Sequence, residues 1–153
     1  MKLYGQRPLT KLERALYAAL VGVVITVFAS ELLDYMELAE RAAMEATLMN
    51  VVAAINVRAA GDTLAMAKPE GERTRNPFDL ARVAPPNFAG ELDGSLPAAG
   101  SWAYDGASDE LVYVPRLHLR LHTANGQPVL RFRLEPDRGP FQRLAPVVRY
   151  RWD

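Results

Sequence analysis

The sequence contains no cysteine, and this absence excludes disulfide bonds, thiolate metal sites and cysteine nucleophiles. Its formal net charge is zero, so overall charge gives no argument for a nucleic-acid partner. The sequence also shows no nucleophile–base pair, no paired carboxylates in an apolar setting and no glycine-rich phosphate loop. These absences predict a protein that is not an enzyme and needs no cofactor.

Neither proline nor glycine occurs from Val23 to Ala60, so no residue of this stretch would break a helix. Its beginning overlaps a run without any charge, Ala15 to Ala29. With Ser30 and the Leu32–Leu33 pair, the run approaches the roughly 20 residues that cross a bilayer. A cleaved secretory signal and a buried core helix are the alternatives. The chain continues after Ala29 into more helix-forming sequence, which favours an uncleaved anchor.

The charges that flank the apolar run differ in sign. The residues before it are basic, and those after it are acidic: Lys2, Arg7, Lys11 and Arg14, then Glu31, Asp34, Glu37 and Glu40. The positive-inside rule therefore predicts a cytoplasmic N-terminus and a periplasmic remainder. Beyond the run, apolar residues recur at helical spacing up to Ile55, which predicts an amphipathic half of the same helix. One side of this half would pack on the protein's own head, and another could pack on copies of the chain.

The start of the chain resembles that of type IV pilins and type II secretion pseudopilins. In that family a basic leader precedes a motif of the form Gly, Phe, Thr, Leu, Ile, Glu and a long apolar helix. Here Leu9-Thr10-Lys11-Leu12-Glu13 is similar to the Phe-Thr-Leu-Ile-Glu portion of that motif. Four later segments are similar, in the same order, to those that lead from the long helix into the sheet in pilin-like proteins. They are Asn76 to Asp79, Ala84 to Gly90, Gly100 to Asp105 and Glu110 to Tyr113.

The resemblance implies that Pro8 and Leu9 form the leader-peptidase junction. It also implies that Glu13 is the carboxylate that guides a new subunit into the filament, by pairing with a neighbour's N-terminal amine. The sequence departs from the family at Pro8, where the peptidase needs glycine, and at the charged Lys11. If the leader is retained, no freed amine exists at Leu9 for Glu13 to meet. Glu13 would then be only a charge at the membrane edge.

The predicted fold is α+β and pilin-like, with a long N-terminal helix packed on a small antiparallel sheet of about four strands. The predicted segments are a basic leader at 1–8, a transmembrane helix at 9–32, its amphipathic continuation at 33–60, a connecting loop at 61–100 and the sheet at 101–153. Gly61 and then Pro69 to Gly71 are the candidate helix stops. Asn76 before Pro77 predicts a short helix to Arg82.

Alternating apolar residues predict the strands of the sheet. Trp102 and Tyr104 begin one strand and Leu111 to Val114 form the next, with a turn at Asp105 to Asp109 that has too few carboxylates for a calcium loop. Asn125-Gly126 predicts a two-residue hairpin. Its register pairs Leu121 with Leu130, Leu119 with Phe132 and Leu117 with Leu134. Val147 to Trp152 would be the last strand, with Val148, Tyr150 and Trp152 facing the core.

The same register places Arg120 opposite Arg131 and His118 opposite Arg133 on the other face. The predicted basic face comprises Arg116, His118, Arg120, Arg131, Arg133, Arg149 and Arg151. Such a face could bind an acidic neighbouring subunit, lipid headgroups or DNA, or it could simply be solvated. DNA is disfavoured because aromatic residues do not interleave the arginines. His118 and His122 share this face but have too few partners for a metal site.

The sequence therefore predicts a structural subunit of a type IV pilus or type II secretion pseudopilus, anchored in the inner membrane by one span. Its expected partners are other pilin or pseudopilin subunits, through the N-terminal helix, and platform proteins of the assembly machinery. With a retained leader it would be a membrane-resident assembly factor or adaptor. The alternative is a single-pass periplasmic binding or adaptor module that uses the basic face.

Overall fold

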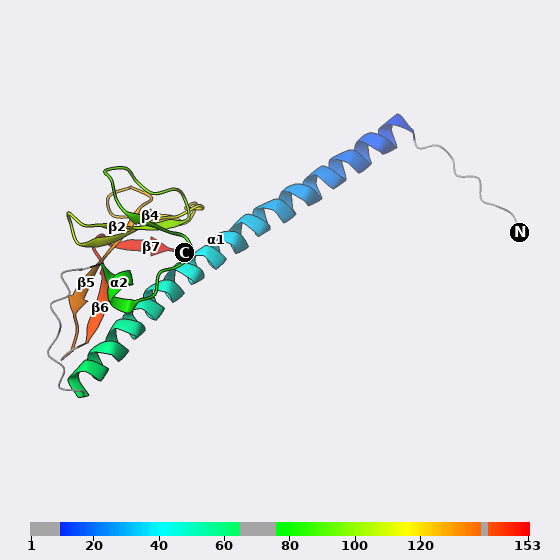
Figure 1. Cartoon of the computed structure of the whole chain (residues 1–153). Helices are drawn as coiled ribbons and strands as arrows, with labels where there is room; N and C mark the ends of the chain where they lie inside the picture. Colours follow the sequence, from blue (N-terminus) through cyan, green and yellow to red (C-terminus); the bar gives the residue numbers. More distant parts are fainter. Residues whose placement is uncertain (1–9, 65–75, 139–140) are drawn as a thin grey trace, which may run out of the picture. The chain divides into compact units, whose positions relative to one another are not determined.

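The computed structural model describes residues 10–64, 76–138 and 141–153. The chain divides into two compact units, Met1–Met36 and Glu37–Asp153. One helix, α1 (Lys11–Leu64), has 54 residues (Figure 1). It supplies most of the first unit and continues into the second. Gly61 does not end it, so that predicted stop is wrong. One glycine costs a helix only about 1 kcal/mol, which the neighbouring turns can offset. The predicted stop at Pro69 to Gly71 lies outside the described residues.

The short second helix, α2 (Pro77–Ala81), confirms the prediction made from Asn76 and Pro77. The Asn76 side chain accepts a hydrogen bond from the Phe78 amide at 3.1 Å. Proline then occupies the first helical position, where its missing N–H has no intrahelical partner to lose. Arg82 ends the helix in the left-handed conformation, with φ of 54°.

The described strands form two sheets (Figure 1). One has five strands in the order β1-β2-β3-β5-β6, and the other has two, β4 and β7. Their bounds are β1 (Phe88–Glu91), β2 (Ser101–Asp105), β3 (Glu110–Val114), β4 (Leu121–Thr123), β5 (Leu130–Pro136), β6 (Gln142–Pro146) and β7 (Tyr150–Trp152). The α+β class is confirmed. The five-stranded sheet is mixed, because β1 pairs with β2 in parallel while the other pairs are antiparallel.

The predicted hairpin around Asn125-Gly126 is wrong. Residues 121–123 pair with 150–152, while β5 pairs with β3 and β6. Residues 123–126 form a turn, in which the Gly126 amide donates to the Thr123 carbonyl at 3.0 Å and Gly126 has a φ of 70°. This turn leads the chain from one sheet into the other.

The observed register also relieves a repulsion that the predicted one contained. Arg131 lies opposite Val112 and Arg133 lies opposite Glu110. The predicted hairpin would instead have placed Arg120 opposite Arg131 and His118 opposite Arg133. Both registers keep the apolar residues on one face, so alternation alone could not distinguish them.

The core of the second unit lies between α1 and one face of the five-stranded sheet. Met44, Val51 and Ile55 are the buried apolar residues of the helix, at the spacing that the sequence predicts. The sheet contributes the large side chains Trp102, Tyr104, Leu111, Tyr113, Leu130 and Phe132. These belong to three adjacent strands and share one face, since Trp102 lies opposite Tyr113 and Leu111 opposite Phe132. The amphipathic half of α1 is therefore the spine on which the sheet is packed.

Candidate functional site

The first unit presents an apolar helix surface that the described residues of that unit leave exposed. Leu16 is 70% exposed and Phe28 73% exposed. The polar side chains in this stretch bond to the helix itself, because Thr26 Oγ1 donates to the Gly22 carbonyl at 2.9 Å and Ser30 Oγ to the Val27 carbonyl at 2.8 Å. Hydroxyls satisfied in this way are compatible with lipid. By length and composition, this is the one described helix that could cross a membrane.

Glu13 lies in the first turn of α1, where it caps the helix. Its Oε2 accepts a hydrogen bond from the Thr10 amide at 2.6 Å, and Thr10 Oγ1 accepts one from the Glu13 amide at 3.2 Å. This reciprocal pair is a capping box, in which both residues satisfy N–H groups left over at the helix start. The Thr-x-x-Glu spacing could have revealed this role from the sequence. Pro8 and Leu9, the predicted junction, lie outside the described residues.

Glu37 is the first residue of the second unit and the most deeply buried carboxylate described, at 2% exposure. Its Oε1 accepts hydrogen bonds from the Arg120 amide at 2.9 Å and from Trp152 Nε1 at 2.8 Å. Its Oε2 is buried and has no hydrogen-bond partner among the described residues. One helical carboxylate thus holds two segments that are distant in sequence, the chain before β4 and the end of β7.

Glu40, one turn further along α1, holds the same part of the head. Its Oε1 accepts hydrogen bonds from the Tyr113 hydroxyl at 2.8 Å and the Arg116 amide at 2.7 Å. Its Oε2 accepts one from the Leu117 amide at 3.1 Å. Burial, together with the bond to the Glu40 carboxylate, raises the pKa of the Tyr113 hydroxyl well above its ordinary value. The hydroxyl therefore stays a donor at every physiological pH.

Arg41 completes this group of helical residues, which we call the helix clamp: Glu37, Glu40 and Arg41. The Arg41 guanidinium donates to Glu45 Oε1 from Nε at 2.9 Å and to the Trp152 carbonyl from Nη1. The hydrogen bond to Glu45 raises the pKa of Arg41 further above its ordinary value. The two-stranded sheet is thereby joined to the helix through both its strands, by Glu37 before β4 and by Arg41 at β7.

A second polar junction fixes the far edge of the five-stranded sheet. Asn56 of α1 donates from Nδ2 to the Gln142 carbonyl at 3.1 Å and accepts from the Gln142 amide at its Oδ1 at 2.8 Å. Gln142 begins β6, the edge strand. The Asn56 side chain therefore makes the two hydrogen bonds that a residue of a further strand would make. It satisfies the N–H and carbonyl groups of Gln142, which at a sheet edge would otherwise be open to pairing with another chain. No local sequence pattern indicates this role for Asn56.

The seven residues of the predicted basic face do not lie on one sheet. Arg131 and Arg133 belong to β5, whereas Arg151 belongs to β7 and Arg149 directly precedes it. The other three, Arg116, His118 and Arg120, lie between β3 and β4. The predicted pairs of Arg120 with Arg131 and of His118 with Arg133 are therefore wrong, because they depended on the hairpin register.

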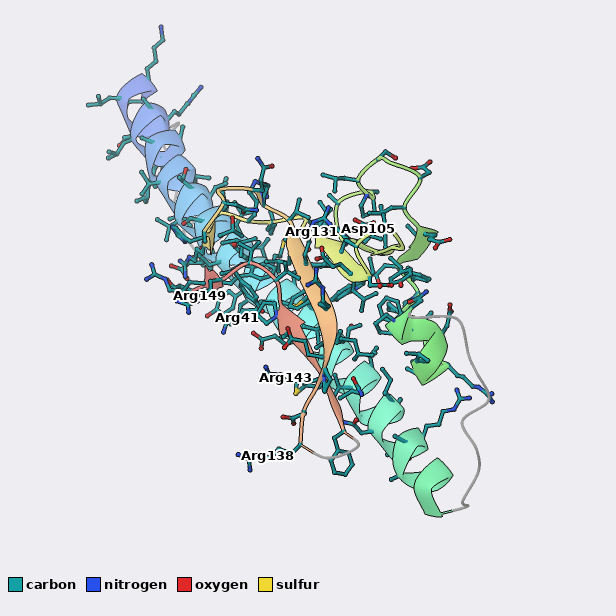
Figure 2. The ribbon with its side chains drawn as sticks, turned by 90° about the vertical axis from the view of Figure 1, so that its left-hand side faces the viewer. Arg41, Asp105, Arg131, Arg138, Arg143 and Arg149 are labelled. Carbon is teal, nitrogen blue, oxygen red and sulfur yellow. The ribbon has the colours of Figure 1, made fainter. Side chains whose placement is uncertain are left out.

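Acidic partners neutralise the β5 arginines. Arg131 Nη1 lies 3.0 Å from Asp105 Oδ2 and 3.1 Å from Glu110 Oε2, and Arg133 Nη2 lies 2.6 Å from Glu110 Oε1. The hydrogen bond from Arg131 lowers the pKa of Asp105 below its ordinary value. Figure 2 shows Arg131 and Asp105 side by side on this face. Two arginines and two carboxylates form a balanced network, so this face does not present excess positive charge.

The described residues of the second unit form several open hollows. One, of about 620 Å³, lies between the 92–96 segment and the outer face at Asp105 and Arg131. Another, of about 490 Å³, lies between Arg41 and Glu45 of α1 and the chain around Tyr150. Among the described residues no group of three or more His, Asp or Glu side chains could hold a metal ion. His122 Nδ1 instead lies 3.0 Å from the Arg120 carbonyl.

These observations define a pilin-like architecture, in which a long apolar N-terminal helix continues as the spine of a β-sheet head. Comparison of the chain with protein-family models, with curated proteins and with solved structures finds no match.

Proposed function

We propose that this protein is a membrane-anchored structural or assembly subunit of a type IV pilus or of a type II secretion pseudopilus. The single observation that carries the proposal is that the two parts of α1 have different surroundings. Its first part exposes an apolar surface long enough to cross a membrane. Its second part contributes Met44, Val51 and Ile55 to the core of the head.

The proposed arrangement has the N-terminus in the cytoplasm and the head in the periplasm, as the flanking charges favour. Partners would pack against the exposed side of the helix, where small residues and exposed Leu38, Met49 and Val57 leave apolar surface. These three side chains lie beyond the predicted span, in the part of the helix proposed to be in water, so packing against a partner helix would remove their apolar surface from water.

The capping box of Thr10 and Glu13 bears on whether the protein keeps or loses its leader, because Glu13 would have a different role in each case. With a retained leader, Glu13 serves its own helix and the protein would act as a membrane-resident assembly factor. With a cleaved leader, the freed amine of Leu9 could draw the Glu13 carboxylate of a neighbour away from Thr10. N-terminal sequencing of the membrane-extracted protein separates them: a chain that starts at Met1 supports the first form, and one that starts at Leu9 the second.

Site-specific photo-crosslinking in native membranes tests the proposal. A photoreactive residue at Val24 or Met49 should yield crosslinks to helices of pilin-like subunits or to a second copy of this chain. The same residue at Arg131 is the matched control and should yield few. The reverse pattern, with crosslinks through Arg131 alone, would favour a periplasmic binding module. The network of Asp105 and Glu110 counts against that alternative, because it neutralises Arg131 and Arg133, two of the seven residues that such a module would use.

A further inference from the structure

The charges of the second unit separate along the part of the sequence that follows α1. Residues 76–110 contain six acidic residues and one arginine, whereas residues 111–153 contain eight arginines and three acidic residues. The network on the outer face accounts for two charges of each sign, because Arg131 and Arg133 pair with two carboxylates. With these four residues set aside and histidine neutral, the first segment carries a net charge of −3 and the second a net charge of +3.

The strand order places these charges at opposite edges of the five-stranded sheet, because β1 is one outer strand and β6 is the other. Glu91 is exposed at the end of β1, and exposed Asp93 follows it. Asp79 of α2 lines the same hollow as Glu91, of about 320 Å³. Glu91 also lines the hollow of about 620 Å³ together with Leu96, which is 55% exposed. This side of the head, which we call the β1 edge, is therefore acidic and has an exposed apolar side chain beside its carboxylates.

Arginines gather at the opposite edge. Arg143 belongs to β6, Arg138 precedes that strand and Arg149 follows it. All three are exposed, and Figure 2 shows them along one side of the head. Arg143 pairs with Glu135 at 3.0 Å, whereas neither of the other two has an ion pair among the described residues. Val147, directly after β6, is 42% exposed. This side, which we call the β6 edge, is therefore basic and also has an exposed apolar side chain.

We infer that the β6 edge of one copy of this chain binds the β1 edge of a second copy, with arginines against carboxylates and Val147 near Leu96. The two edges have opposite charge, so each attracts the other and repels its own counterpart. Because the two surfaces in contact differ, the interface is heterologous and leaves one edge of each copy open for a further copy. Exposed ion pairs contribute little individually, so we expect a weak contact that salt disrupts. The inference goes beyond the proposed function, since every residue in it belongs to the second unit.

The absence of cysteine allows a direct test by crosslinking. Ala89→Cys places a thiol at an exposed position of β1, Val147→Cys places one beside β6, and neither removes a charge. The two full-length variants, one with a larger tag, are mixed in detergent at low salt and treated with a short bismaleimide. We expect the mixed dimer as the main product, with a yield that falls at high salt. In the control mixture Ala124→Cys, at an exposed position after β4, replaces Val147→Cys and should give little product.

Charge reversal tests the attraction itself. Arg143→Glu/Arg149→Glu in the chain with the β6 thiol should lower the yield of mixed dimer about tenfold. Glu91→Lys/Asp93→Lys in the chain with the β1 thiol should have an effect of the same size. A mixture of the two reversed chains should restore the yield, which misfolded variants could not do.

Three results would overturn the inference. They are a mixed dimer no more abundant than in the control mixture, homodimers of either variant as abundant as the mixed dimer, and reversed chains whose combination does not restore the yield. None of them bears on whether α1 crosses a membrane, so the proposed function would stand. Conversely, the proposed function could fail in the photo-crosslinking of α1 while the mixed dimer forms as expected.

Discussion

The Tyr113 hydroxyl donates a 2.8 Å hydrogen bond to Glu40 Oε1 across 73 residues of sequence. This contact joins the middle of the five-stranded sheet to the helix at the residue that also holds the Arg116 and Leu117 amides. It couples a core tyrosine, 4% exposed, to a carboxylate that already accepts two backbone amides. The junction between the spine and the head is therefore polar, although the core directly above it is apolar and aromatic.

Removal of this hydroxyl should weaken the head in a pH-dependent way. Tyr113→Phe should lower the free energy of unfolding by about 2 kcal/mol near neutral pH, the usual contribution of a hydrogen bond to a charged group. Because the pKa of Tyr113 is raised in the folded state, its contribution is complete below about pH 10 and falls as pH rises above that value. The variant should therefore lose less stability between neutral and strongly alkaline pH than the wild type. Denaturant unfolding of the detergent-solubilised protein measures this, since both tryptophans, Trp102 and Trp152, lie in the head. A parallel alkaline decline in the two proteins would contradict it.

Truncation of Glu37 should have a larger effect. Glu37→Ala leaves the Arg120 amide and Trp152 Nε1 without their acceptor, so we expect a loss of about 3 kcal/mol in unfolding free energy. Glu37→Gln keeps an acceptor oxygen and should cost much less. Glu31→Ala, at an exposed helical position, is the control and should change stability little. If Glu37→Ala and Glu31→Ala unfold at the same denaturant concentration, the clamp does not hold the head.

The edge junction at Asn56 predicts a local effect. Asn56→Leu removes both bonds to Gln142 and should cost about 2 kcal/mol. Hydrogen exchange at the Gln142 amide should accelerate, while exchange in β2 and β3 should change only with global stability. Asn50→Leu is the matched control on an exposed position of the same helix. Equal acceleration throughout the sheet would show that Asn56 has no local role.

The arginine–carboxylate network predicts the behaviour of the head in acid. The pKa of Asp105 is lowered by its hydrogen bond from Arg131. Its contribution to stability is therefore present above about pH 4 and is lost as pH falls below that value. Asp105→Asn should cost about 1 kcal/mol at neutral pH, because the pair is partly exposed. The variant should also show a shallower decline in acid than the wild type, as acid titration of tryptophan fluorescence can measure. An unchanged slope would contradict this contribution.

The sequence predicts those parts of the fold that depend on local pattern. The long helix, the α2 cap at Asn76, and strands β2 and β3 follow from the absence of breakers, from capping chemistry and from alternation. Strands β1 and β6 were missed because β1 lies in a stretch rich in Pro, Gly and Ala, and β6 depends on Asn56 for its edge partner. The hairpin failed because Leu130 and Phe132 fit the apolar face of β3 as well as they fit Leu121 and Leu119. The two registers differ in their long-range charge pairs, because the observed one brings Arg131 and Arg133 to Asp105 and Glu110.

The candidate site was less predictable for the same reason. In the sequence, Glu37 and Glu40 are two of the charges that follow a predicted membrane span. Nothing local indicates that they accept backbone amides from the segment between β3 and β4. The role of Glu13 in a capping box was available from Thr10, three residues earlier.

We propose that the first part of α1 lies in lipid and that its second part lies in water as the spine of the head. Thiol accessibility along α1 tests it most directly. Single cysteines at Leu20, Phe28, Met49 and Val57 are exposed on the helix surface in the absence of lipid, and the chain has no other cysteine. In spheroplasts, a membrane-impermeant maleimide should label positions 49 and 57 rapidly and positions 20 and 28 only after detergent is added. Equal labelling of all four before detergent would contradict the account.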